Sequence, residues 1–133
     1  MSYIDKINEH KQILKKCKDS AAFNIGAGRA YYCVFISIKK YLVDKQFDYL
    51  TFLRDSNKSN ERAYSHGTIK AALFKCLLNN KNTITDISKL NVIDNLYRKR
   101  KIADYDERNI SEIEFLDSFK EMKIILDILE TSQ

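Results

Sequence analysis

Apolar side chains recur every three or four residues along most of this chain, a spacing that predicts amphipathic α-helices. The first helix is expected over residues 3–18, with Ser2 placed to cap its N-terminus and lysines along its outer face. Residues 46–64 break this pattern, so we expect a loop there, with one short helix around residues 47–53.

Residues 20–45 form the most apolar segment, and between Ala30 and Ile38 apolar groups occupy nearly every face of a helix. A helix of this kind lies at the centre of a core, or is shared between a core and a partner subunit. Gly26 and Gly28 weaken the helix locally but allow another backbone to come close. The segment therefore predicts a central helix. Because its apolar surface exceeds what one bundle face needs, it also predicts a symmetric homodimer.

Two further helices are expected in the middle of the chain. Ser65 is suited to cap the first of them, which runs to about Leu78, and Thr83 with Asp86 starts the second after a polar turn. The apolar side chains expected to face the core are Ile69, Leu73, Cys76 and Leu77 in the first helix and Ile87, Leu90, Ile93 and Leu96 in the second.

The last helix carries the clearest signals. Ser111 and Glu114 match a capping box, and Ile110 and Phe115 match the hydrophobic staple around it. The apolar seam that follows alternates spacings of four and three residues and consists of Phe115, Phe119, Met122, Leu126 and Leu129. These patterns predict a single all-α domain over residues 1–133, an up-and-down bundle of four long helices plus one shorter helix.

Charge is distributed unevenly along the chain, whose formal net charge is +5. Of the 23 basic and 18 acidic side chains, residues 104–133 hold three and nine, which leaves 20 and nine in residues 1–103. A basic body of this kind suggests an anionic partner. The same distribution is expected if the acidic last helix packs against basic neighbours within the fold.

Cysteine and histidine give no sign of a metal or a cofactor. Cys17, Cys33 and Cys76 lie far apart among apolar or helical neighbours, which is typical of buried free thiols in a reducing compartment. Neither His10 nor His66 has ligand-forming neighbours at metal-site spacing, so we expect His10 at a helix boundary and His66 at a helix start. Without a signal-peptide pattern or a segment of membrane-spanning length, the expectation is a soluble, cytoplasmic protein.

Four consecutive cations stand near the end of the next-to-last helix, and they have two interpretations. In the structural one, Arg100 lies near the buried face and pairs with Asp104 four residues on. Arg29, just before the aromatic run of the central helix, is expected as a third member of this group. Lys99 and Lys101 then point into solvent.

In the functional interpretation the same block binds RNA. Arg98 and Arg100 contact phosphates, for which a guanidinium is well shaped. Lys99 and Lys101 add positive charge beside them. Tyr105 then stacks or hydrogen-bonds at the same place.

Three segments resemble small bacterial proteins of the HEPN superfamily. They are GRAYYCVF at residues 28–35, SHGTIKAAL at 65–73 and RKIADYDERNISEIEF at 100–115, in the same order as in that group. The resemblance implies a helical bundle that usually dimerises. It also implies a link to RNA binding or RNA cleavage, often in toxin–antitoxin or phage-defence loci. Active members cut RNA without a metal, using the RNA's own 2′-hydroxyl as nucleophile.

In those ribonucleases an Arg is followed several residues later by a His, and this chain departs from that pattern. Ala103, Asp104, Tyr105 and Asp106 stand where the His is expected, and a carboxylate does not replace imidazole near pH 7. The resemblance thus assigns any catalytic role to Arg100, Asp104 and Tyr105, and the missing His argues against standard acid–base cleavage.

The resemblance also bears on partners. Tyr105 corresponds roughly in position to a tyrosine that a partner nucleotidyltransferase adenylylates in some HEPN toxins. The alternative to an RNA-directed enzyme is a non-catalytic helical adaptor or dimerisation module, which binds a protein partner such as a nucleotidyltransferase.

Overall fold

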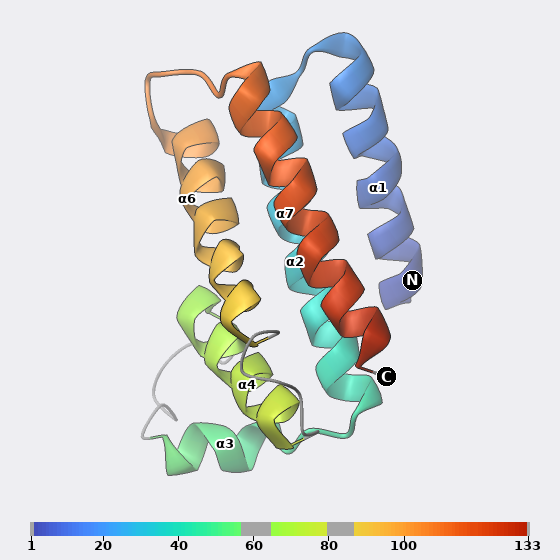
Figure 1. Ribbon diagram of the computed structural model, residues 1–133, viewed down its shortest axis with the longest axis vertical. Helices are drawn as coiled ribbons and strands as arrows, with labels where there is room; N and C mark the ends of the chain where they lie inside the picture. The colour runs from blue at the N-terminus through green and yellow to red at the C-terminus, as the bar shows by residue number, and fades with distance from the viewer. Residues whose placement is uncertain (1, 57–64, 80–86, 133) are drawn as a thin grey trace.

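The computed structural model describes residues 2–56, 65–79 and 87–132, and all regular structure in these ranges is helical (Figure 1). The predicted all-α class is confirmed. In chain order the elements are α1 (Tyr3–Ser20), α2 (Phe23–Asp44), α3 (Tyr49–Asp55), α4 (His66–Asn79), the 3₁₀ turn η1 (Lys89–Asn91), α6 (Val92–Tyr105) and α7 (Glu112–Thr131). The predicted helix start at Thr83 and Asp86 lies outside the described residues, and so do residues 57–64 of the predicted 46–64 loop.

Four helices run along the long axis of the molecule and alternate in direction: α1, α2, α6 and α7 (Figure 1). The shorter α3 lies at the end of the bundle where the chain terminates, and α4 lies beside that end. Since α4 and α6 each have 14 residues, five helices of at least this length occur in the described ranges. The predicted count of four long helices plus one shorter is therefore not reproduced exactly.

Helix α2 is the centre of the bundle, as predicted, because it packs against α1, α4, α6 and α7. Its buried apolar and aromatic side chains include Ala30, Tyr31, Cys33, Val34, Ile38, Tyr41 and Leu42. Other helices of the same chain thus cover most of the faces of α2. The apolar character of this helix no longer argues for a partner subunit, and the homodimer stays a prediction.

Side-chain caps define the helix starts that the sequence indicated. Ser2 and Asp5 form a full capping box at α1, and Ser111 and Glu114 form another at α7. At α4 the hydroxyl of Ser65 accepts a hydrogen bond from the backbone N–H three residues on, at 3.4 Å. These caps satisfy N–H groups that a helix cannot bond internally.

The predicted core positions are mostly confirmed. All eight inward-facing residues predicted for the two middle helices are buried, and the three cysteines are buried free thiols. The seam of α7 is the exception: Phe115, Met122 and Leu129 are buried, but Phe119 and Leu126 are only half-buried. None of the described helices combines the length and apolar character that crossing a membrane requires.

Candidate functional site

The four cations at residues 98–101 do not form one patch, because α6 distributes them over different faces. A helix turns by about 100° per residue, so Lys99 and Arg100 lie on opposite flanks of the buried stripe that includes Leu96. Lys99 contacts α7, whereas Arg100 contacts α2. Arg98 and Lys101 are exposed. The predicted single block of positive charge is therefore divided.

Lys99 is buried, so the expectation that it points into solvent is wrong. Its side chain is 5% exposed, and its Nζ lies 2.5 Å from Oε1 of Glu121 on α7. Helix α6 packs between α2 and α7, so its buried stripe is wide. Beyond Leu96 the stripe includes the residue three positions on as well as the residue four positions on. The charge of Lys99 is thus neutralised inside the fold, and the acidic last helix does pack against a basic neighbour.

Arg98 belongs to a shallow cleft of mixed charge. The cleft has a volume of about 340 Å³ and lies between α6 and α7. Its lining residues are Asn95, Arg98, Lys99, Asp117, Lys120 and Glu121. Acidic side chains close to Arg98 reduce the attraction of this cleft for phosphate.

Arg100 is the best-connected cation of the four. Its Nη2 donates a hydrogen bond of 2.7 Å to the hydroxyl of Tyr32. The guanidinium carbon lies 5.4 Å from the ring centre of Tyr32 and 5.6 Å from that of Tyr105, both within cation–π range. Arg100 therefore joins the aromatic residues of α2 to the end of α6.

The predicted pair between Arg100 and Asp104 is confirmed as an ion pair, with 3.1 Å between Nε and Oδ2. It does not have hydrogen-bond geometry, since the buried Nε of Arg100 makes no hydrogen bond. The Asp104 side chain is 41% exposed, so the pair is weaker than a buried one. The positive charge of Arg29 acts to lower the pKa values of His10 and Cys17 of α1, and its membership in the Arg100 group stays a prediction.

Tyr105 and Lys101 form the accessible part of this region. Tyr105 is 75% exposed, which is unusual for a large aromatic side chain. Lys101 Nζ lies 4.8 Å from the ring centre of Tyr97, one turn earlier on α6. Along the last turns of the helix, the half-buried Tyr97 and Arg100 are thus followed by the exposed Lys101 and Tyr105.

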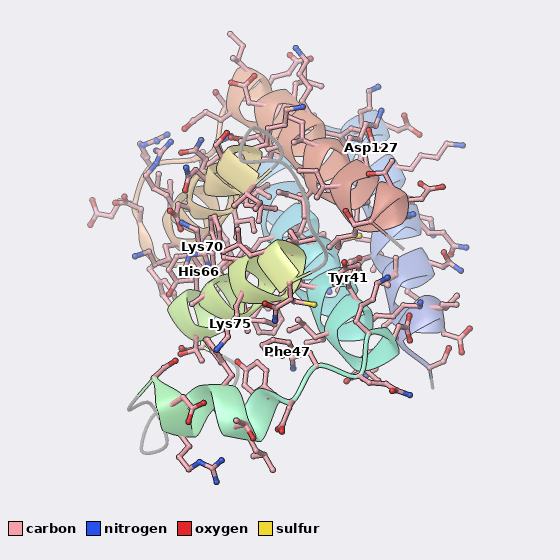
Figure 2. All side chains as sticks on the ribbon, turned by 60° about the horizontal axis from the view of Figure 1, so that its bottom comes forward. Tyr41, Phe47, His66, Lys70, Lys75 and Asp127 are labelled. Carbon is pink, nitrogen blue, oxygen red and sulfur yellow. The ribbon has the colours of Figure 1, made fainter. Side chains whose placement is uncertain are left out.

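His66 is the residue that the sequence interpretation missed. Its ring stacks on Tyr97, with ring centres 4.0 Å apart and planes at 7°. Its Nε2 lies 2.9 Å from Oδ1 of Asp94, whose Oδ2 accepts a hydrogen bond of 2.6 Å from Lys70. Figure 2 shows His66 and Lys70 at the same end of α4. His66 thus connects α4 to α6 instead of only supporting its own helix start.

The hydrogen-bond partners of His66 constrain the positions of its protons. Burial raises the pKa of Tyr31, so its hydroxyl stays protonated, and it lies 3.3 Å from His66 Nδ1, to which it donates when the imidazole is neutral. The Nε2–H of His66 then donates to Asp94. Burial acts to raise the pKa of Asp94, but hydrogen bonds from Lys70 and His66 outweigh it and the net pKa is lowered. Asp94 is therefore a carboxylate that orients the imidazole.

Ring contacts join these residues, which are exposed or half-buried except for the buried Tyr31, into one connected group that we call the tyrosine–cation face. It consists of Tyr31, Tyr32, His66, Lys70, Asp94, Tyr97, Arg100, Lys101, Asp104 and Tyr105, contributed by α2, α4 and α6. It combines cations for phosphate, aromatic rings for stacking and an oriented imidazole for proton transfer. Of the predicted site residues, Arg100, Lys101, Asp104 and Tyr105 belong to this face, whereas Arg98 and Lys99 do not.

The sequence carried one weak signal for His66. It follows the N-cap of α4 and lies in the segment SHGTIKAAL, which resembles the HEPN group. A helix start places a side chain at one end of the bundle, where it can reach a neighbouring helix. The identity of that neighbour depends on how α4 packs, and the spacing of residues along α4 does not contain that information.

Comparison with known proteins adds no family to this picture: no family model, no curated protein and no solved structure matches the chain. The likeness to the HEPN superfamily therefore rests on the three motif segments alone.

Proposed function

We propose that the chain binds single-stranded RNA on the tyrosine–cation face, as a cytoplasmic protein of HEPN type. The observation that carries this proposal is the alternation of the exposed Tyr105 with the cations Arg100 and Lys101 at one end of α6. Proteins that bind single strands without sequence preference combine stacking rings with cations in the same way. Stacking on Tyr105 positions a base, and the two cations contact the adjoining phosphates.

Binding is measured by the fluorescence anisotropy of a labelled single-stranded RNA. We expect Lys101→Gln combined with Tyr105→Ala to weaken affinity at least about tenfold, since one base stack alone contributes roughly 1–3 kcal/mol. Lys16→Gln, an exposed change on α1, is the matched control and should leave affinity unchanged. Equal affinity of the double variant and the Lys16→Gln control would contradict the proposal. If the wild type does not bind RNA even at low salt, the protein-adaptor alternative becomes the leading one.

Metal-independent cleavage is a second function, which the contact between His66 and Asp94 favours. An oriented imidazole supplies the proton acceptor that is missing from the family's usual position. In the reaction, His66 takes the proton of the 2′-hydroxyl, whose oxygen attacks phosphorus. The 5′-oxygen leaves and takes a proton from water, and His66 later returns its proton to solvent, so the products are a 2′,3′-cyclic phosphate and a 5′-hydroxyl.

Cleavage is tested with total RNA in the presence of a metal chelator. His66→Asn should abolish cleavage and leave binding intact, whereas Arg100→Ala should reduce both. Binding without cleavage by the wild type would restrict the protein to RNA recognition. Cleavage that survives His66→Asn would exclude this imidazole as the proton acceptor.

The HEPN likeness extends the proposal to a toxin–antitoxin or phage-defence role. The exposure of Tyr105 makes its hydroxyl accessible to a nucleotidyltransferase, as adenylylation requires. A gene for a small nucleotidyltransferase beside this one, followed by intact mass measurement of the co-expressed wild type and Tyr105→Phe, tests this extension. An adenylyl group on the wild type alone is the expected result.

A further inference from the structure

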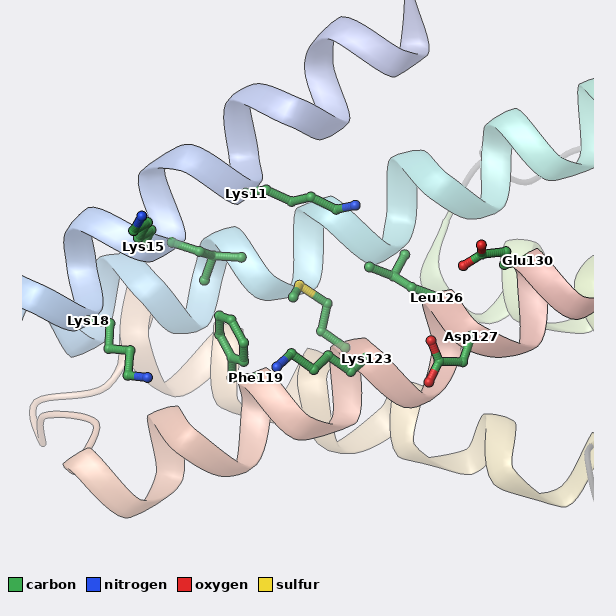
Figure 3. Close-up of a pocket in the computed structure, with 10 residues that line it drawn as sticks. Lys11, Lys15, Lys18, Phe119, Lys123, Leu126, Asp127 and Glu130 are labelled. Carbon is green, nitrogen blue, oxygen red and sulfur yellow. The ribbon is translucent and has the colours of Figure 1, made fainter.

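A groove between α1 and α7 lies apart from the tyrosine–cation face and shares no residue with it. Helix α1 packs on α2, and α7 packs on α2 and α6, but α1 and α7 do not pack closely on each other. The space between them has a volume of about 570 Å³ (Figure 3). It is a channel with two helical walls and a third helix beneath.

The floor of the groove is apolar because the predicted seam of α7 is incompletely covered. Phe119 and Leu126, both seam positions, are half-buried and line the groove together with the buried Leu14 and Met122. Phe119 and Leu126 are seven residues apart, which is the repeat by which one helix meets another in knobs-into-holes packing. The side of α7 left open thus has the spacing of a helix–helix contact.

Charge is arranged along the groove with opposite signs at its two ends. Lys18 and Lys123 lie toward one end, and Asp127 and Glu130 lie toward the other (Figure 3). Lys11 and Lys15 continue the positive rim along α1. Lysine stems cover apolar surface and keep their ammonium groups at the edge, where an acidic partner can reach them.

We propose that this groove binds an amphipathic helix of a partner protein, with leucine-like side chains toward Phe119 and Leu126 and acidic residues toward the lysine rim. The groove wall from Phe119 to Glu130 is about 16 Å long, which accommodates about three helical turns. Four lysines against two acids favour an acidic occupant, and Asp127 with Glu130 favour a basic residue at one end of it. Helix-in-groove recognition uses anchors at this spacing.

The test is selection from a displayed library of amphipathic helices about 18 residues long, against the full chain. Leucine occupies the a and d positions of each member, and the flanking positions vary among Glu, Lys and Gln. We expect enriched sequences to carry Glu at the flanks. They should bind at least tenfold less tightly to Phe119→Ser combined with Leu126→Ser. Enrichment without a preference for Glu, or no enrichment, would overturn the proposal.

A charge-reversal variant tests the proposal without changing the apolar residues, whose replacement could also disturb folding. Lys15→Glu combined with Lys18→Glu changes exposed residues, and circular dichroism checks that the helices persist. On this variant the selection should favour Lys at the flanks. The same Glu preference on both proteins would contradict binding at the lysine rim. A wild-type dimer that dissociates in this variant, as seen by light scattering, would show that a second copy covers the groove and would also overturn the proposal.

Discussion

At the scale of single residues, Lys99 and Arg100 show how neighbours in sequence acquire different roles. Each has an acidic partner, but Lys99 is buried and the Glu121 side chain is 14% exposed, whereas the Asp104 side chain is 41% exposed. Removing one member of a buried pair leaves an uncompensated charge away from water. The larger penalty is therefore expected for loss of Lys99, and a smaller one for loss of Asp104.

We expect Lys99→Ala to lower the free energy of unfolding by about 3 kcal/mol, because it leaves the largely covered Glu121 carboxylate unpaired. Lys99→Met combined with Glu121→Leu should be close to neutral, since it removes both charges. Asp104→Ala is the matched control and should cost less than about 1 kcal/mol. Urea denaturation measures all three. A Lys99→Ala protein as stable as Asp104→Ala would show that burial of this pair has no energetic consequence.

At the scale of helices, Gly26 sets the distance between α2 and α7. A Cβ at this position would lie 2.2 Å from Cε1 of Phe115 and 3.3 Å from Cβ of Cys17. Phe115 is fully buried, so its ring has no free space into which to move. At Gly28 a Cβ would meet no atom within 4 Å. The two glycines, two residues apart, therefore have different reasons to be present.

Gly26→Ala should destabilise the protein by about 2 kcal/mol, as overpacking in a filled core does. Gly28→Ala should stabilise it by up to about 1 kcal/mol, because alanine favours a helix over glycine. Thermal unfolding of the two variants beside the wild type is the measurement. Two shifts of the same sign would mean that α2 and α7 are not held this closely together.

The start of α7 supplies a pH-dependent contribution. Hydrogen bonds from Arg108 and from the Ser111 backbone lower the pKa of Glu114 from 4.5 to about 2. A carboxylate whose pKa is lower in the folded state stabilises the fold above pH 4.5, and this contribution is lost as pH falls toward 2. Stability should therefore decrease on acidification through this window.

Glu114→Gln isolates that contribution, since glutamine can still complete a capping box. Its melting temperature should lie about 3 °C below that of the wild type at pH 6. The two should converge as the pH approaches 2. Glu112→Gln, in the same helical turn but without Arg108 as partner, is the control. A difference that does not change with pH would assign the effect to the cap alone.

At the scale of the whole molecule, the uneven charge of the chain is only partly compensated by the fold. Glu121 neutralises Lys99, but Glu114 pairs with Arg108 from the same acidic region, so much of the positive charge of residues 1–103 stays available. If RNA binds through phosphate contacts, its affinity must fall with salt. The expected log–log slope is about −1.4 for two contacts on a single strand.

Lys101→Gln should reduce this slope by about 0.7, the value of one contact, and weaken binding to every RNA tested. Anisotropy titrations over a range of salt concentrations measure the slope, with Lys16→Gln as control. A slope unchanged by Lys101→Gln would remove this residue from the contact surface.

Most helices, their caps and most of their buried stripes could be predicted from the amino-acid sequence. The cap at Ser2, the capping box at Ser111 and buried positions such as Leu90 and Leu96 were predicted because they depend on side chains within one or two helical turns. The central position of α2 followed from its apolar character on nearly every face. In each case the information is local, or is averaged over a whole helix.

Which flank of each helix is covered depends on the packing of helices against one another. Lys99 is buried because α7 covers its side of α6, and His66 contacts Tyr31 and Asp94 because α4 packs on α2 with its first turn close to α6. Phe119 stayed half-exposed because α1 does not close against α7. Helical periodicity identifies the centre of the apolar face of a helix. Which edge of that face is also covered depends on the packing of helices that are distant in the chain.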